Sequence, residues 1–313
     1  MLKDWISEAR PRTLLLSASN CSLGCALGFY YGSVDCFNMM VAALIVTTGM
    51  LMQIISNLAN DYGDAVRGSD TEQRLGPVRG VMTGAISLNQ LKRAMAMVIV
   101  LTAIVGLLAI ILSVGDDLNT TAWFVFLGVV SIVAALFYTL GMAYGYKGLG
   151  DVAVFIFFGV LAVIGPQLMI TNISGSGLEV YPDSFLLCIS VGMGSVMLLN
   201  VANMRDIVED SENGKKTLAV RFGRRFAAFY HMVLFAMVTA MSFLACFLSH
   251  KSWEISILGV SLIPLFATTY RAVTNVQDGS KIAPELKFTA LGVFFHHSAW
   301  IAVLIMDYWI YQI

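Results

Sequence analysis

The sequence contains very little charge. Asp, Glu, Lys and Arg together account for 12% of its 313 residues, whereas a soluble domain usually carries about 25%. With 58% apolar residues and a mean hydropathy of +0.78, the composition excludes an ordinary water-soluble protein and favours a lipid bilayer as its surroundings. The charges are also nearly balanced, at 19 basic against 20 acidic residues, so we expect no nucleic acid among its partners.

Cysteine is also scarce, and its spacing excludes a disulfide or metal framework. No two of the five cysteines form a C-x-x-C pair, and most lie within apolar stretches. We therefore interpret them as small apolar packing residues. They are Cys21, Cys25, Cys36, Cys188 and Cys246.

A cleavable signal sequence is not expected either. Basic residues precede an apolar run near the N-terminus, but the uncharged stretch 13–34 has 22 residues. That is longer than the roughly 7–15 residues of a signal core, and no small-residue cleavage site is evident. We expect this stretch to be a membrane-spanning helix.

Long apolar runs are abundant. Eight stretches of at least 19 residues, and one of 16, contain no Asp, Glu, Lys or Arg. About 20 helical residues cross the roughly 30 Å hydrocarbon layer of a bilayer. The shortest stretch, 255–270, can extend over Arg271, whose long stem reaches to the interface. Because backbone groups in lipid must be satisfied within the segment, each stretch is expected to be a helix.

We therefore predict an all-α, polytopic membrane protein in which residues 1–313 form one domain with nine transmembrane helices. The helices are expected at roughly 13–34, 36–60, 92–115, 120–143, 152–174, 184–204, 226–249, 254–273 and 288–310. If the N-terminus is cytoplasmic, all of the 19 basic residues except Lys251 fall on the cytoplasmic side. The positive-inside rule then places the C-terminus outside, in the inner (cytoplasmic) membrane of a cell, and supports an odd number of helices.

A short pattern occurs twice, at the same place in the predicted topology. The runs N-L-A-N at 57–60 and N-V-A-N at 200–203 each close an apolar stretch and open into an acidic loop. They end the second and sixth helices, which both run toward the cytoplasm. This repetition predicts two similarly oriented four-helix units plus a ninth helix, arranged around a central cavity.

Acidic and amide side chains cluster where these two helices end. At 100° per residue, the spacing in each set places its members on one helix face, within an arc of about 100° for the first set and 120° for the second. The first set is Asn57, Asn60, Asp61 and Asp64, followed by Asp70, and the second is Asn200, Asn203, Asp206 and Asp210.

Two such faces suit a hard divalent cation. Mg²⁺ typically binds one or two carboxylates together with substrate phosphates, and the neighbouring Arg205 and Lys215 would bind the remaining phosphate charge. The alternative is that both sets are simply solvated helix ends. Polar groups at membrane depth argue against it, because they are costly there and are usually functional. Asn57, Asn200 and Gln53 fit that description.

Two basic residues in predicted loops allow two interpretations each. Arg79 lies among glycines in the segment 76–87, which is either a phosphate-facing loop or an ordinary turn before a helix capped by Ser87. Lys147 lies in a short turn after Tyr144, and either reaches a diphosphate or only contributes to the topology.

His296 and His297, within the last apolar stretch, are interpreted as neutral core histidines bonded to their neighbours.

Several runs together resemble the UbiA superfamily of intramembrane aromatic prenyltransferases, and within it the branch that acts on 1,4-dihydroxy-2-naphthoate in menaquinone synthesis. The resemblance covers most of the chain, and the two acidic motifs are its most specific part. The matching runs are A-R-P-R-T-L (9–14), N-L-A-N-D-Y-G-D (57–64) with R-G-S-D-T (67–71), G-P-V-R-G (76–80), Y-K-G-L-G-D (146–151), N-M-R-D-I-V-E-D (203–210) and G-K-K-T-L-A-V-R-F-G (214–223).

The resemblance implies a Mg²⁺-dependent enzyme with roles for particular residues. The implied metal ligands are Asp61, Asp64, Asp206 and Asp210. The implied diphosphate-binding residues are Asn57, Asn203, Arg79 and Lys147. We expect the substrates also to contact Gln53, Asn200 and Tyr144.

The resemblance to this superfamily also implies the reaction. A polyprenyl group passes from an allylic diphosphate to 1,4-dihydroxy-2-naphthoate, with loss of diphosphate and carbon dioxide, giving demethylmenaquinone. Members that act on hydroxybenzoate usually carry an acid four residues after the second Asp of the first motif, where this chain has Gly68. That departure agrees better with the naphthoate branch. Another aromatic acceptor, such as 4-hydroxybenzoate, is the alternative.

Two other classes fit less well. A secondary transporter places its polar groups near the bilayer midplane on broken helices, whereas these acids lie at helix ends. A CDP-alcohol phosphotransferase also uses aspartates at the membrane edge, but its D-G-x-x-A-R motif is absent from the sequence. We therefore expect a prenyltransferase.

Overall fold

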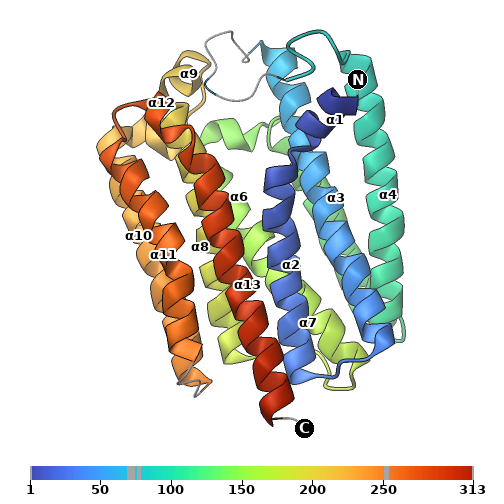
Figure 1. Cartoon of the computed structure of the whole chain (residues 1–313). Helices are drawn as coiled ribbons and strands as arrows, with labels where there is room; N and C mark the ends of the chain where they lie inside the picture. The colour runs from blue at the N-terminus through green and yellow to red at the C-terminus, as the bar shows by residue number, and fades with distance from the viewer. Residues whose placement is uncertain (1, 69–74, 76–78, 250–253, 312–313) are drawn as a thin grey trace.

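The computed structural model describes residues 2–68, 75, 79–249 and 254–311, arranged as Figure 1 shows. These described residues form helices joined by short turns, without any strand, which confirms the all-α prediction. In chain order the elements are α1 (Leu2–Ala9), α2 (Pro11–Tyr31), α3 (Cys36–Arg67), α4 (Leu88–Val114), α5 (Leu118–Phe137), the 3-10 helix η1 (Tyr144–Lys147), α6 (Gly150–Val154), the π-helix η2 (Phe155–Leu161), α7 (Ala162–Ile173), α8 (Pro182–Arg205), α9 (Ile207–Glu212), α10 (Leu218–Leu248), α11 (Glu254–Thr274), α12 (Gly279–Ile282) and α13 (Glu285–Tyr311).

Within the described residues, nine helical segments are long and apolar enough to cross a membrane, as predicted. Most spans pack against their neighbours in the sequence, and α13 packs against α2, so that the bundle closes on itself. Helix α1 and the C-terminal end of α13 lie at opposite ends of the bundle in Figure 1, as an odd number of crossings requires. The short helices α1, α9 and α12 gather at one end, which we call the basic end because Arg10 and Arg205 lie there.

Two helices extend more than five residues beyond their predicted limits, because charged residues there belong to a helix rather than to a loop. Helix α3 continues to Arg67 instead of ending near residue 60. It stops at Gly68, whose φ of 67° lies in the left-handed region and lets its N–H bond back to the carbonyl of Asp64. Helix α10 begins at Leu218 rather than 226, and Gly223, with φ 82°, kinks it.

Helix α5 is shorter than predicted. It ends at Phe137 instead of 143, because the chain turns through Gly141 and Ala143, whose φ values are 52° and 43°. The predicted N-cap at the start of the third span is confirmed: Ser87 forms a capping box with Gln90 ahead of α4.

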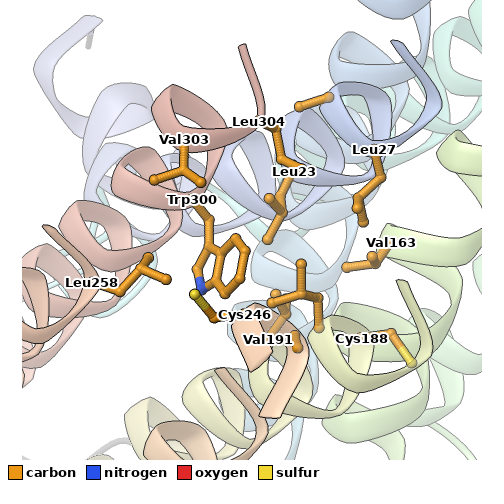
Figure 2. Close-up of a cluster of buried hydrophobic side chains, with 13 residues drawn as sticks. Leu23, Leu27, Val163, Cys188, Val191, Cys246, Leu258, Trp300, Val303 and Leu304 are labelled. Carbon is orange, nitrogen blue, oxygen red and sulfur yellow. The ribbon is translucent and has the colours of Figure 1, made fainter. Parts of the chain in front are cut away.

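The core on the side of α8, α10, α11 and α13 is filled by apolar side chains. The cluster shown in Figure 2 contains Trp300 and draws residues from six helices, including Leu23 of α2 and Leu258 of α11. Cys188 and Cys246 belong to this cluster, and all five cysteines are free. Four of them are buried, which confirms the packing interpretation, whereas Cys36 is exposed at the start of α3.

The two histidines of α13 are buried and hydrogen-bonded, as predicted. His296 lies between two serine hydroxyls, with Nε2 2.9 Å from Ser242 Oγ and Nδ1 2.7 Å from Ser261 Oγ. His297 Nδ1 lies 3.2 Å from Ser19 Oγ. These contacts join α13 to α10, α11 and α2, because a polar group in an apolar interior needs a partner.

Candidate active site

A large cavity extends from the basic end into the bundle. Its volume is about 670 Å³, and residues of α2, α3, α4, α5, α7 and α8 line it. That volume falls within the range of roughly 300–1,000 Å³ typical of small-molecule sites. The acidic residues lie at one end of the cavity, and the lining on the membrane-spanning segments is mostly apolar, from Leu16 through Ile45 to Met169.

The first acidic motif lies on the last turns of α3, and amide side chains fix this helix against α2. Asn57 Nδ2 donates to the carbonyl of Ala9 at 3.0 Å and to Thr13 Oγ1 at 3.2 Å. Gln53 Nε2 donates to Asn57 Oδ1 at 3.0 Å, while Gln53 Oε1 accepts from Ser17 Oγ at 3.0 Å. This chain of bonds sets the position of the carboxylates one and two turns further along.

Asp61 is enclosed by two guanidinium groups. Its side chain is fully buried and contacts both Arg10 and Arg79. Arg10 precedes Pro11 with φ 49° and ψ 68°, a left-handed conformation that is unfavourable for a residue with a Cβ. Strain of this kind is often found at functional sites, where the surroundings enforce it.

The spacing predicted that the second motif lies on one helix, but the structure divides it between two helices. Helix α8 ends at Arg205, the chain bends at Asp206, and Asp210 is carried by the short helix α9. The Arg205 guanidinium donates to both carboxylate oxygens of Asp206 at 2.6 Å. The bend turns Asp210 into the cavity wall, where its side chain is buried.

A single lysine joins the two motifs. Lys215 Nζ lies 3.3 Å from Asp210 Oδ1 and 3.8 Å from Asp64 Oδ1. Because α3 carries one of these aspartates and α9 the other, the two distant acidic segments meet at one point. The predicted convergence of the two motifs is therefore present in the structure.

Tyr146 completes this junction. Its hydroxyl donates to Asp64 Oδ1 at 2.6 Å, and its ring lies 4.9 Å from Lys215 Nζ and 4.7 Å from Arg67 Cζ, both in cation–π range. The backbone N–H of Lys216 donates to the Tyr146 carbonyl at 2.8 Å. The turn after α5 is thus held against the segment that follows α9.

Burial controls the charge of this cluster. It raises the pKa of Asp210 to about 6, above the ordinary 3.8, although Lys215 acts in the opposite direction. Burial alone would lower the pKa of Lys215, but the carboxylates of Asp64 and Asp210 outweigh it and raise that pKa above its usual 10.5. The ammonium group is therefore charged at neutral pH.

The cavity brings together most of the predicted site residues. Those that line it are Gln53, Asn57, Asp64, Arg79, Tyr144, Asn203, Arg205, Asp206, Asp210 and Lys215. Tyr144 differs from the expectation in one respect, because its hydroxyl already donates to the Ala134 carbonyl at 2.8 Å. Asp61 lies beneath Arg10 and Arg79 rather than on the surface of the cavity. Asp70 lies outside the described residues.

Two predicted residues lie elsewhere, and both placements are corrections. Asn200 is buried against α10, where its Nδ2 donates to the Ala227 carbonyl at 3.0 Å. It holds α8 to α10 rather than facing the cavity. The side chain of Lys147 is exposed at the surface, and its carbonyl accepts a bond from Arg221 at 2.6 Å. Neither residue is among the described residues that line the cavity.

Sequence reasoning overlooked two residues of the site. Arg10 precedes the first apolar stretch, and only its place in the matching run A-R-P-R-T-L distinguished it from a topology charge. Tyr146 was part of a matching run, but a tyrosine in a turn carries no chemical signal of its own. Both become visible only through their contacts with Asp61 and Asp64.

The oxygen atoms at the mouth of the cavity fit Mg²⁺. Asp64, Asp206 and Asp210 line it together with Asn60, and the buried Asn60 Oδ1 and Asp61 Oδ2 have no hydrogen-bond partner among the described residues. Hard oxygen ligands of this kind suit Mg²⁺. Among the described residues, no three His, Cys, Asp or Glu side chains are grouped closely enough to hold a metal by themselves.

Two known proteins are similar to this chain over most of its length. The chain is 36% identical over 307 residues to the 1,4-dihydroxy-2-naphthoate octaprenyltransferase of Escherichia coli (strain K12), covering 97% of this chain and 96% of the relative. It is 38% identical over 289 residues to the enzyme of the same name from Haemophilus influenzae, covering 91% and 90%.

Solved structures share the fold. The apo structure of a UbiA homolog from Aeropyrum pernix K1 matches with a TM-score of 0.68 at 11% identity, over 94% of this chain and 97% of that one. A UbiA homolog from Archaeoglobus fulgidus, bound to DMAPP and Mg²⁺, matches with a TM-score of 0.59 at 17% identity, over 96% and 99%. The family model described as the UbiA prenyltransferase family matches residues 21–300, and the chain therefore belongs to that family.

Proposed function

We propose that this protein transfers a polyprenyl group from an allylic diphosphate to 1,4-dihydroxy-2-naphthoate, with release of diphosphate and carbon dioxide. The observation that carries the proposal is the meeting of Asp64 and Asp210 at one ammonium group, at the mouth of a largely apolar cavity. The names of the relatives with 36% and 38% identity support this acceptor and a long prenyl tail.

The charged end of the cavity would hold the diphosphate. Asp64, Asp206 and Asp210, with Asp61, would hold Mg²⁺, which when bound supplies the positive charge that makes diphosphate a better leaving group. Arg79, Arg205 and Lys215 line the same end of the cavity and offer N–H donors to phosphate oxygens.

Binding of the diphosphate would replace the ion pairs that the aspartates now form with basic side chains. Each of the four aspartates now faces a basic side chain, whether Arg10, Arg79, Arg205 or Lys215. A diphosphate attracts these basic groups more strongly than a single carboxylate does, because it carries more charge. If these basic groups turned to the diphosphate, the carboxylate oxygens would be free to hold the metal.

The bonds that break and form follow from the two substrates. The bond between the prenyl C1 and the diphosphate oxygen breaks, and its electron pair leaves with diphosphate. The ring carbon that bears the carboxylate donates an electron pair to C1. The carbon–carboxylate bond then breaks, its electrons restore the aromatic ring, and carbon dioxide leaves. The product is the reduced form of demethylmenaquinone, and no proton need be removed at that carbon.

The apolar part of the cavity would hold the prenyl tail. Exposing a tail to water costs about 0.8 kcal/mol per CH₂, so it belongs in the apolar lining formed by α3, α4, α5 and α7. Phe157 and Phe158 line the same cavity, and their rings can stabilise a developing allyl cation. Excluding water also prevents capture of that cation before the ring attacks.

The distribution of charge supports a location in the cytoplasmic membrane. The basic end carries Arg10, Arg79, Arg205 and Lys215 and would face the cytoplasm by the positive-inside rule. The N-terminus would then lie inside and the C-terminus outside. Both the diphosphate and the water-soluble acceptor would reach the cavity from the cytoplasmic side.

The test is an assay of the purified protein in detergent with MgCl₂ and octaprenyl diphosphate. One arm contains 1,4-dihydroxy-2-naphthoate labelled in its carboxyl group, and the other contains 4-hydroxybenzoate. We expect prenylated naphthol product and labelled carbon dioxide in equal amounts in the first arm. Product with hydroxybenzoate but never with the naphthoate would refute the acceptor, and no product in either arm would refute the reaction.

A further inference from the structure

Two glycines on the cavity wall have open space where a side chain would be. A Cβ built on Gly128 of α5, or on Gly165 of α7, meets no atom within 4 Å. Several other helix glycines are packed closely; at Gly24, for example, a Cβ would lie 2.4 Å from the Val163 carbonyl oxygen. Gly128 and Gly165 are therefore not required for helix packing.

The open space at both glycines belongs to the cavity. On α5, Gly128 lies four residues from Phe124 and from Ile132, and all three line the cavity. On α7, Gly165 lies four residues from Leu161 and from Met169, which also line it. Residues four apart share a helix face, so each glycine occupies the middle of the face that its helix turns toward the cavity.

Both glycines lie well below the charged end. Gly128 is at the middle of α5, and Gly165 is in the half of the span Gly150–Ile173 that is further from the basic end. Beyond them the lining continues to Ile45 and Met169. A tail anchored by its diphosphate at Asp64 must pass this level before it can fill the deeper part.

The length of the prenyl tail decides whether it reaches the depth of Gly128 and Gly165. Three backbone bonds of an extended peptide span at most about 3.6 Å, so the four bonds of a prenyl unit span roughly 4.8 Å by the same geometry. Two units then cover roughly 10 Å and eight units roughly 38 Å. The hydrocarbon layer is roughly 30 Å thick. A tail of two units therefore ends before the middle of the layer, and a tail of eight units extends past it.

We propose that Gly128 and Gly165 keep the deeper part of the cavity open and thereby set the longest prenyl tail that this enzyme accepts. The inference rests on the proposed function, because it assumes that the cavity holds the tail. Side chains at these positions would narrow the cavity without touching the acidic motifs. They would turn an enzyme for long tails into one restricted to short tails.

The test compares graded substitutions at each glycine with two donors. Gly128 and Gly165 are each replaced by Ala, Leu and Phe, and turnover is measured with geranyl diphosphate (two units) and octaprenyl diphosphate (eight units). We expect kcat/KM for the octaprenyl donor to fall with side-chain size, by about tenfold or more at Phe, and to change less than about threefold for the geranyl donor.

Gly259 provides the matched control. It lies within α11, and a Cβ there also meets nothing within 4 Å, but it is not among the described residues that line the cavity. Gly259→Phe should leave the ratio of the two donors unchanged. Because Ala and Leu favour helices more than Gly does, the smaller substitutions at 128 and 165 retain the fold, and size-exclusion profiles check this for each variant.

The outcomes separate the two proposals. An unchanged donor ratio in the Phe variants would overturn the role of the glycines, as would an equal loss with both donors in a variant that remains monodisperse. Failure of the unsubstituted protein with both donors would instead refute the prenyltransferase activity itself.

Discussion

Asp64 and Asp210 contact the same ammonium group, at 3.8 Å and 3.3 Å from Lys215 Nζ. One aspartate comes from the end of α3 and the other from α9, so this contact joins two segments that are far apart in the sequence. A cation between two carboxylates reduces their mutual repulsion. Lys215 thus occupies, in the protein alone, a position suited to a metal ion or to a diphosphate counter-charge.

The first prediction concerns this lysine. Lys215→Ala should lower kcat/KM for the prenyl diphosphate by about tenfold to a hundredfold, because a charge-assisted bond is worth about 1.5–3 kcal/mol. Lys216→Ala is the control: its exposed side chain lies next in sequence, and its backbone bond to Tyr146 is retained. Steady-state assays at several donor concentrations measure both. Equal effects of the two substitutions would contradict the assignment.

Asp61→Ala and Asp206→Ala should differ in their effect on the stability of the protein, although we expect both to abolish activity. Asp61 is fully buried, whereas the side chains of Arg10 and Arg79 are 28% and 11% exposed. Asp61→Ala leaves both guanidinium groups without this partner, at a cost of about 3 kcal/mol. The Asp206 side chain is 17% exposed, and Asp206→Ala should reduce stability much less. We expect both variants to lose turnover, but only Asp61→Ala to unfold at a clearly lower temperature.

Thermal unfolding followed by tryptophan fluorescence makes that comparison, and prenylated product measures turnover. If Asp206→Ala kept full activity, Asp206 would have no part in metal binding. If the two variants unfolded at the same temperature, the buried ion pairs of Asp61 would contribute nothing measurable to stability.

The metal-free protein should show a pH dependence that comes from Asp210. Its pKa in the folded protein is about 6, above the ordinary 3.8, so the folded state binds this proton more tightly than the unfolded chain does. The resulting stability is fully present below pH 3.8 and is lost as the pH rises to about 6. Asp210→Asn removes this dependence.

Unfolding temperatures in EDTA between pH 4 and pH 7, the window set by that pKa, test this expectation. The slope of stability against pH should be smaller in Asp210→Asn than in the unsubstituted protein. Identical slopes would mean that Asp210 is not the group that titrates.

With Mg²⁺ present the proton and the metal compete, so more Mg²⁺ should be needed for half-maximal activity below pH 6.

The nine spans could be predicted from the sequence because the constraint is local. A bilayer requires about 20 apolar residues in a row, and charged residues mark where each run ends. The same reasoning misplaced the end of α3, since Asp61 and Asp64 belong to the helix and are neutralised by contacts with Arg10 and Lys215. Charge in the sequence signals water only when no partner in the fold compensates it.

The acidic motifs were predictable as sets, but the direction of each side chain was not. Asn200 occupies the same place in its N-x-A-N run as Asn57, yet it points to α10 and bonds to the Ala227 carbonyl. The bend at Asp206 ended the regular helix on which the angular argument depended. Which face of α8 meets the cavity is decided by packing against α10, a long-range contact that spacing along one helix cannot reveal.

Tyr146 provides the last prediction, because its hydroxyl bond and its ring contacts can be separated. Tyr146→Phe removes the hydroxyl bond to Asp64 but retains the ring beside Lys215, whereas Tyr146→Leu removes both. A hydrogen bond to a charged group is worth about 1.5–3 kcal/mol, and an exposed cation–π contact about 0.5–1 kcal/mol. We expect Phe to reduce kcat/KM by about tenfold and Leu by several-fold more. Tyr270→Phe is the control, since Tyr270 is exposed on α11 and is not among the described residues that line the cavity. If Tyr146→Phe were fully active, Asp64 would be positioned by Lys215 alone, and the turn after α5 would have no part in aligning the two acidic motifs.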